Sequence, residues 1–124
     1  MSDRFSVNAR IQSVRYAING LMILWQEQHN CRVHFIATVL VLLCGLMLSI
    51  SATEWILLLL LIAMVWVAEA LNSSVEYLCD RVTTEQDPLI AKAKDVAAAG
   101  VLIAAILAAV GGLILFIPAL MRIQ

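Results

Sequence analysis

The chain has 124 residues, of which 63% are hydrophobic and 14% charged, and its mean hydropathy is +0.95. A soluble domain of this size could not keep so much apolar surface away from water, so the composition predicts that the lipid bilayer is the solvent. The net charge of −1 gives no reason to expect a nucleic acid partner. The three cysteines match neither a disulfide framework nor a zinc site.

The N-terminal segment has the pattern of an amphipathic helix over residues 5–27. Apolar residues recur at spacings of three and four, and polar and basic residues occupy the rest of the helical wheel. The apolar positions are Val7, Ile11, Val14, Ile18, Leu21 and Trp25. This pattern predicts a helix that lies on the membrane surface.

Three apolar runs follow, and they predict an all-α integral membrane protein with a single membrane domain over residues 1–124. We expect transmembrane helices over residues 30–50, 54–82 and 89–120, the second with a cytoplasmic extension. At about 1.5 Å per residue, runs of roughly 17 to 25 apolar residues match a hydrocarbon core about 30 Å thick. The short linker between the first two runs predicts an antiparallel hairpin in which Ser51 or Thr53 caps the second helix.

Basic residues are divided unequally across these predicted spans. Seven of the eight lysines and arginines flank one side: Arg4, Arg10, Arg15, Arg32, Arg81, Lys92 and Lys94. Only Arg122 falls on the other side. Because cytoplasmic flanks carry the excess of positive charge, we expect a cytoplasmic N-terminus and an external C-terminus.

Polar residues continue the second apolar run toward the cytoplasm. Positions 69, 72, 76 and 80 advance by three, four and four residues, so they share one helical face over about 16 Å. These positions hold Glu69, Asn72, Glu76 and Asp80. A carboxylate near the hydrocarbon edge costs about 2.5 to 3.5 kcal/mol on the insertion scale, so this face needs protein, water or an ion beside it.

Three explanations of this polar face stay open from the residues alone. It can form an interhelical hydrogen-bond network for assembly, or it can line an ion or proton path. It can also be catalytic, with one carboxylate as a base and another binding Mg²⁺, which prefers oxygen ligands and brings phosphates with it. Lys94 enters the third run from the same side, where it would neutralise phosphate charge or serve as an ordinary positive-inside flank.

Two longer motifs are similar to those of a known family. They are Glu69-x-x-Asn72-Ser73-x-Val75-Glu76-x-x-x-Asp80 and Ala93-Lys94-Asp95-Val96-Ala97-Ala98. Shorter matches are Tyr16-Ala17-x-x-Gly20 and Asn30-x-Arg32-Val33-His34. With these motifs the chain resembles the prokaryotic diacylglycerol kinase family, which includes undecaprenol kinases.

The resemblance implies an enzyme that transfers the γ-phosphate of ATP to the hydroxyl of a membrane lipid alcohol, with Mg²⁺ as cofactor. Diacylglycerol, giving phosphatidic acid, is the favoured acceptor, and undecaprenol is the alternative. It also implies a homotrimer in the bacterial inner membrane. Each subunit would carry a surface helix and three transmembrane helices, and the active sites would form between subunits at the cytoplasmic interface.

The resemblance further implies roles for individual residues. Glu69 is expected to be the general base and, with Ala98, to contact the lipid substrate, while Glu76 is expected to bind Mg²⁺. On a helix Glu76 lies about 10 Å nearer the cytoplasm than Glu69, which fits these roles. The expected ATP contacts are Arg10, Tyr16, Asn72, Glu76, Glu85, Gln86, Asp87, Lys94 and Asp95.

The chain departs from the family pattern at two positions. The family's second metal-binding glutamate aligns with Gln28, beside Glu27, so either Glu27 takes over the metal or the metal is bound more weakly. Asp87 stands where the family often has a histidine. Because both changes touch the nucleotide side, a non-catalytic assembly or ion-path subunit stays open as an alternative of another class.

The two histidines, His29 and His34, invite a metal-site interpretation. They are five residues apart and lack a third ligand of suitable spacing. We therefore interpret them as histidines of the membrane interface.

Overall fold

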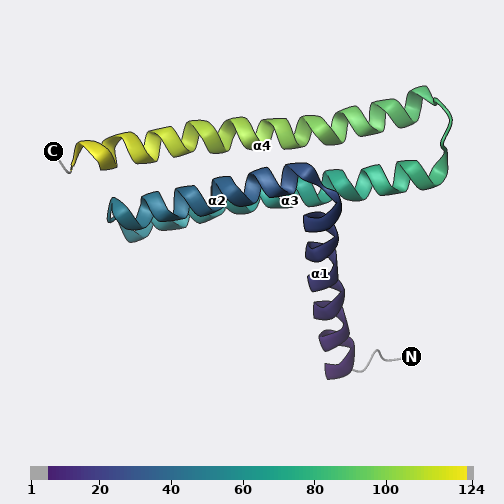
Figure 1. The fold of residues 1–124 in the computed structure, drawn as a ribbon, viewed down its shortest axis with the longest axis horizontal. Coiled ribbons are helices and arrows are strands. Elements are labelled where there is room, and N and C mark those ends of the chain that lie inside the picture. Colours follow the sequence, from purple (N-terminus) through teal and green to yellow (C-terminus); the bar gives the residue numbers. More distant parts are fainter. Residues whose placement is uncertain (1–5, 123–124) are drawn as a thin grey trace.

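The computed structural model describes residues 6–122, and over these residues the chain forms four helices (Figure 1). They are α1 (Val7–Glu27), α2 (His29–Met47), α3 (Ala52–Val82) and α4 (Pro88–Met121). The expected start of the first helix at residue 5 lies outside the described residues. Helices α2, α3 and α4 are each long and apolar enough to cross a membrane, which confirms the expectation of three such helices.

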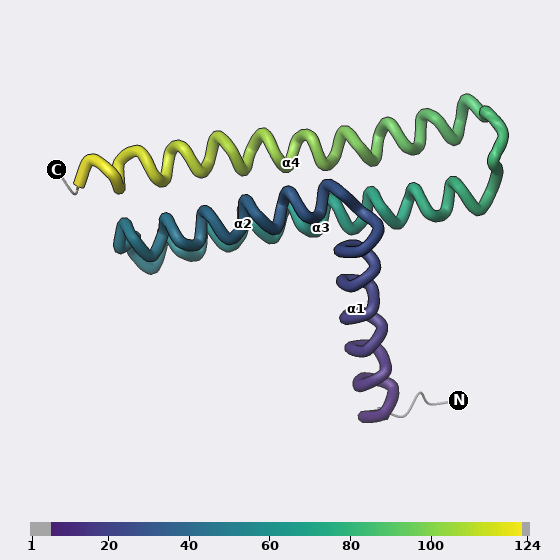
Figure 2. Tube along the Cα trace, viewed as in Figure 1, coloured from purple at the N-terminus to yellow at the C-terminus, as the bar shows by residue number. Residues whose placement is uncertain are grey.

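Helix α3 is the central element, because it packs against both α2 and α4. These three helices run side by side, whereas α1 leaves them at a steep angle and points away (Figure 2). With 31 and 34 residues, α3 and α4 are about 46 and 51 Å long, which exceeds a hydrocarbon core of about 30 Å. The ends of α3 and α4 that meet at their connecting loop extend past the start of α2 (Figure 1).

The bend between α1 and α2 is centred on one residue. Gln28 adopts an extended conformation, with φ −101° and ψ 108°, and so interrupts what would otherwise be one continuous helix. The Arg32 guanidinium donates to the carbonyl oxygens of Trp25 (3.1 Å) and Gln26 (2.9 Å) at the end of α1. These carbonyls have no partner further along a terminating helix, so Arg32 satisfies them and stabilises the bend.

The α2–α3 hairpin forms as expected, but α2 ends three residues before the predicted end at residue 50. Ser49 has a positive φ of 48°, its N–H donates to the Leu46 carbonyl, and the Ile50 N–H donates to the Gly45 carbonyl. This pairing terminates a helix through a left-handed residue. Ser51 then caps α3, with its side chain and that of Glu54 forming reciprocal bonds, so the expected cap is Ser51 and not Thr53.

Packing at the hairpin end fixes α4 to the α2–α3 turn. Ile50, Leu58, Leu115 and Ala119 form a buried cluster. The Arg122 guanidinium adds an ion pair with the Glu54 carboxylate at 2.8 Å. The end of α4 therefore lies at the same end of the molecule as the hairpin, opposite the α3–α4 loop.

Gly45 allows the Trp55 ring to pack directly against α2, which generates a prediction about stability. A Cβ atom at position 45 would lie 2.8 Å from Cη2 of Trp55, whereas a Cβ at Gly100 would meet nothing within 4 Å. We expect Gly45→Val to lower the free energy of unfolding by about 1–3 kcal/mol through overpacking. The matched variant Gly100→Val should unfold near the wild-type temperature. Thermal unfolding in detergent measures both, and equal melting temperatures would contradict this packing.

Candidate active site

The central feature of the site is a buried polar cluster on α3. Glu69, Asn72 and Ser73 are buried, with Glu69 only 1% exposed. Glu69, Asn72 and Glu76 line one cavity of about 390 Å³, so the shared helical face expected for them is confirmed. The same cavity is bordered by Asn30 and His34 of α2 and by Ala98 of α4. Three helices therefore build the cavity around the acidic face of α3.

Glu69 has an unusual environment for a carboxylate. Among the described residues, neither of its carboxylate oxygens has a hydrogen-bond partner. His34 lies nearest as an ionisable partner, with its Nε2 atom 3.6 Å from Oε2 of Glu69. A buried polar group without hydrogen bonds is costly, so such a group is more readily explained by chemistry than by a contribution to stability.

Asn72 and Glu76 are joined one turn further along α3. The Asn72 Nδ2 atom donates to Oε1 of Glu76 at 3.0 Å. This leaves Oδ1 of Asn72 buried and without a partner in the described part of the chain. The cavity wall is thus rich in oxygen acceptors, contributed by Glu69, Asn72 and Glu76.

This donor set fits a magnesium ion in its chemistry. Mg²⁺ is bound by oxygen atoms, often by one or two carboxylates together with waters and substrate phosphates. Residues 6–122 contain no cluster of three or more His, Cys, Asp or Glu side chains arranged for a metal. The chain would therefore supply few ligands, chiefly the oxygens of Glu76 and Asn72, and phosphate or water would supply the others.

Glu27 and Gln28, the two candidates for a further metal ligand, both form hydrogen bonds with Tyr77. The Tyr77 hydroxyl donates to Oε2 of Glu27 at 2.9 Å and accepts from Nε2 of Gln28 at 3.4 Å. Sequence reasoning did not assign Tyr77 a role, although it directly follows Glu76 in the motif. Its hydroxyl links α3 to the bend between α1 and α2.

A second cavity, of about 420 Å³, lies at the α3–α4 loop. Glu85, Gln86, Asp87 and Lys94 all line it, so the structure brings these four predicted nucleotide residues together. The Asp87 carboxylate also accepts from the N–H groups of Leu89 (2.7 Å) and Ile90 (3.2 Å), which makes it the N-cap of α4. Part of its hydrogen-bonding capacity therefore serves the fold.

Lys94 has a partner that sequence reasoning did not assign to it. Its Nζ atom lies 2.5 Å from Oδ1 of Asp80, the last acid of the α3 face. The Lys94 and Asp80 side chains are 39% and 67% exposed, so solvent screens the pair and it contributes little to stability. Its effect is to hold the lysine amine between α3 and α4 at the edge of the loop cavity.

The remaining predicted residues are not gathered within one chain. Arg10 and Tyr16 belong to the part of α1 that points away from the other helices, far from the α3–α4 loop (Figure 2). Tyr16 is exposed, and its hydroxyl accepts from Gln12 on the same helix at 2.8 Å. Asp95 is exposed on α4. A single chain therefore presents the α1 residues and the loop residues at separate places.

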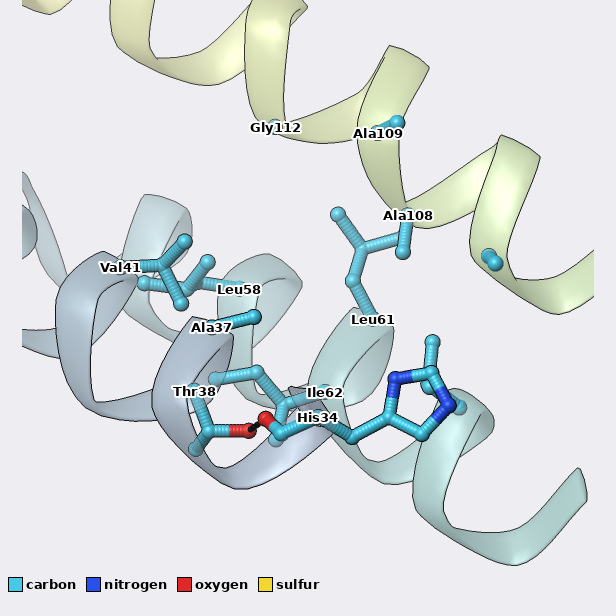
Figure 3. Close-up of a pocket in the computed structure, with 12 residues that line it drawn as sticks. His34, Ala37, Thr38, Val41, Leu58, Leu61, Ile62, Ala108, Ala109 and Gly112 are labelled. Carbon is cyan, nitrogen blue, oxygen red and sulfur yellow. Dashed lines mark hydrogen bonds between the residues drawn. The ribbon is translucent and has the colours of Figure 1, made fainter. Parts of the chain in front are cut away.

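An apolar cavity of about 290 Å³ lies between α2, α3 and α4 next to the polar cavity (Figure 3). His34 and Ala105 border both cavities. The apolar walls include Leu58, Leu61 and Gly112, so this cavity suits hydrocarbon and not charge. The polar and apolar cavities are therefore neighbours, with His34 between them.

The protein is similar to characterised bacterial enzymes over most of its length. The family model described as prokaryotic diacylglycerol kinase matches residues 15–116. The undecaprenol kinase of Bacillus subtilis (strain 168) is 32% identical over 117 residues, which cover 94% of this chain and 95% of the relative. The diacylglycerol kinase of Escherichia coli (strain K12) is 32% identical over 100 residues, covering 81% and 82%.

The apolar helices and these matches define the class of the protein as a multi-pass bacterial membrane enzyme, a lipid kinase that transfers phosphate to an alcohol group. The family match includes every candidate residue on α3, on α4 and in the loop between them. The chain belongs to the prokaryotic diacylglycerol kinase family.

Tyr77 generates a prediction about how firmly α1 is attached. Tyr77→Phe removes the hydroxyl that contacts Glu27 and Gln28, a loss of about 1 kcal/mol for an exposed contact. Amide hydrogen exchange in the last two turns of α1 should become about fivefold faster. The matched variant Tyr16→Phe loses only a bond within α1 and should leave these rates unchanged. Equal exchange in both variants would show that Tyr77 does not hold the bend.

Proposed function

We propose that the protein transfers the γ-phosphate of ATP to the hydroxyl of a membrane lipid alcohol, with diacylglycerol as the favoured acceptor and phosphatidic acid as its product. The observation that carries this proposal is the Glu69 carboxylate, which is 1% exposed and has no hydrogen-bond donor among the described residues. A lipid hydroxyl entering the adjacent cavity would be such a donor. An apolar cavity borders the same site, as the tail of a lipid requires.

In this mechanism Glu69 acts as the general base. The hydroxyl oxygen of the lipid forms a bond to the γ-phosphorus, and the bond between that phosphorus and the β,γ-bridging oxygen breaks to release ADP. The hydroxyl proton passes to the Glu69 carboxylate and then to solvent. A lipid hydroxyl in the cavity would occupy the acceptor position in place of water, so transfer to the lipid would be favoured over hydrolysis of ATP.

The nucleotide is assigned to the residues on the loop side of Glu69. Mg²⁺ would be held by Glu76 and Asn72, with Glu27 or Gln28 as a further ligand, and would shield the charge of the phosphates. Lys94 would exchange its contact with Asp80 for a phosphate oxygen. Asp95 and the loop residues Glu85, Gln86 and Asp87 would complete the nucleotide contacts together with Arg10 and Tyr16.

Assembly as a homotrimer would account for residues that one chain keeps apart. Arg10 and Tyr16 belong to α1, which points away from the other helices of its own chain (Figure 1), so a neighbouring subunit would bring them to a nucleotide. Many large apolar side chains of α2, α3 and α4 are exposed in the single chain, which supports contacts with lipid and with other subunits.

The proposed orientation places this site at the cytoplasmic face of the inner membrane. The N-terminus would be cytoplasmic and α1 would lie on the membrane surface. The Arg122–Glu54 ion pair holds the end of α4 beside the α2–α3 hairpin, so a cytoplasmic α3–α4 loop would put this end of α4 on the external side. ATP is available only on the cytoplasmic side, where the loop residues would then be.

Undecaprenol is a second candidate acceptor, because the undecaprenol kinase of Bacillus subtilis matches 94% of the chain, compared with 81% for the Escherichia coli diacylglycerol kinase. The test supplies Mg-ATP to the purified protein in mixed micelles that contain either diacylglycerol or undecaprenol. We expect phosphate transfer with a higher kcat/KM for diacylglycerol. A higher value for undecaprenol would reverse the preference, and transfer to neither lipid from folded protein would contradict the kinase proposal.

Glu69 and Glu76 are proposed to have different tasks, and the isosteric amides separate them. Glu69→Gln removes the proton acceptor, so the transfer rate should fall by about 10² to 10⁴ while Mg-ATP binding is largely kept. Glu76→Gln removes an anionic metal ligand, so Mg-ATP binding should weaken and recover in part at higher magnesium.

Transfer rate, nucleotide affinity and oligomeric state are measured on both variants. If the acidic face served only assembly, both amides could still hydrogen-bond between helices, and any defect would follow loss of the oligomer. Near-normal turnover of Glu69→Gln in a folded oligomer would show that the base is a different group.

A further inference from the structure

His34 is the side chain that the structure places against Glu69 from a different helix. Its Nε2 atom lies 3.6 Å from Oε2 of Glu69, and the side chains are 19% and 1% exposed. No hydrogen-bond donor reaches either Glu69 oxygen among the described residues. Within residues 6–122 the imidazole is the only ion-pair partner of this carboxylate, and the buried Cys31 thiol of α2 is a second titratable group close enough to interact with it electrostatically.

The position of His34 is fixed by contacts that run back to α3. The Thr38 hydroxyl donates to the backbone carbonyl of His34 at 2.7 Å, as the dashed line in Figure 3 shows. The same hydroxyl accepts from the Trp66 indole N–H at 3.0 Å. Trp66 lies three residues before Glu69 on α3, so this chain of bonds sets the register of His34 against Glu69.

Packing confines the buried Glu69 side chain, but without a hydrogen bond the orientation of its two carboxylate oxygens is not fixed. General base catalysis needs the accepting oxygen within about 2.6–3.2 Å of the hydroxyl, and a misplacement of about 1 Å can lower a rate by about 10². A ring N–H directed at Oε2 would fix this orientation and leave Oε1 to accept from the substrate. Because His34 borders both the polar and the apolar cavity, it would do so where the head of a lipid meets its tail.

We infer that His34 is a positioning residue for phosphate transfer, acting through Glu69: on substrate binding the 3.6 Å separation closes to hydrogen-bond distance and Nε2–H donates to the carboxylate. This inference rests on the proposed function, in which Glu69 is the base. It replaces the interpretation of His34 as an ordinary interface histidine. His29 keeps that interpretation, since it is exposed at the start of α2.

Steady-state kinetics on two substitutions of His34 tests the inference. His34→Leu removes the donor and keeps apolar volume, so kcat should fall about tenfold to a hundredfold while KM for lipid and for Mg-ATP changes by less than about twofold. His34→Gln places an amide N–H near the former Nε2 and should restore kcat to within about threefold of the wild type. The matched control His29→Leu should leave all three constants unchanged.

The double variant tests whether His34 acts through Glu69. In the Glu69→Gln background, His34→Leu should cause no further loss, because the group that it positions is already inactive. An unchanged kcat in His34→Leu would overturn the inference. A rise in the KM for lipid alone would also overturn it and would make His34 a wall of the lipid site, as would losses that multiply in the double variant.

A spectroscopic measurement tests the pair without any reaction. The chain has two histidines, so ¹⁵N-labelled histidine gives two sets of ring signals, and His29→Leu identifies those of His34. Glu69→Gln should shift the Nε2 signal of His34, whereas Lys92→Gln should not. If these signals shift but the wild type transfers no phosphate, the proposed function is wrong and the His34–Glu69 contact is supported. If transfer depends on Glu69 but the signals do not shift, the His34–Glu69 contact is wrong and the proposed kinase function is supported.

Discussion

The rest of the structure depends on the burial of one carboxylate, that of Glu69, whose oxygens have no hydrogen-bond partner among the described residues. Glu69 sits inside a helix that is apolar enough to cross a membrane, and burial of such a group is costly. On one side the carboxylate faces His34 of α2, whose Nε2 atom lies 3.6 Å from Oε2. The other side opens to a cavity. The buried carboxylate therefore borders a space that a substrate could enter.

Along α3, the apolar surroundings of Glu69 are separated from the charged side chains nearer the α3–α4 loop. Glu69 faces the cavity that adjoins the hydrocarbon-like space, Glu76 lies two turns further on, and Asp80 holds Lys94 beyond it. A lipid substrate and a nucleotide have opposite solvent preferences, so they must approach such a site from opposite ends. In the proposed function one long helix, α3, would serve both substrates, because Glu69 lies beside the apolar cavity and Asp80 lies further along, near the α3–α4 loop.

Patterns along the sequence predicted the features that depend on residues within a single helix. The three apolar helices, the Ser51 cap and the shared face of Glu69, Asn72 and Glu76 all follow from spacing within one segment. Contacts between helices were not predictable in this way. The His34–Glu69 and Lys94–Asp80 pairs depend on the register of neighbouring helices, which no single periodicity encodes. The early end of α2 depends on the positive φ of Ser49, a conformation that serine rarely adopts.

Because Gln28 is the single extended residue between α1 and α2, a small rotation at Gln28 would displace the far end of α1 by a large distance. The end of α1 that carries Arg10 lies about 26 Å from the bend, so a rotation of about 10° there moves it by about 4 to 5 Å. That displacement exceeds the length of a hydrogen bond. The Arg32 contacts close the end of α1 but do not fix its direction relative to α3. The direction of α1 therefore depends on contacts near the bend, including the Tyr77 hydroxyl on Glu27 and the Trp25 ring against Phe35, more than 15 Å from Arg10 along the helix.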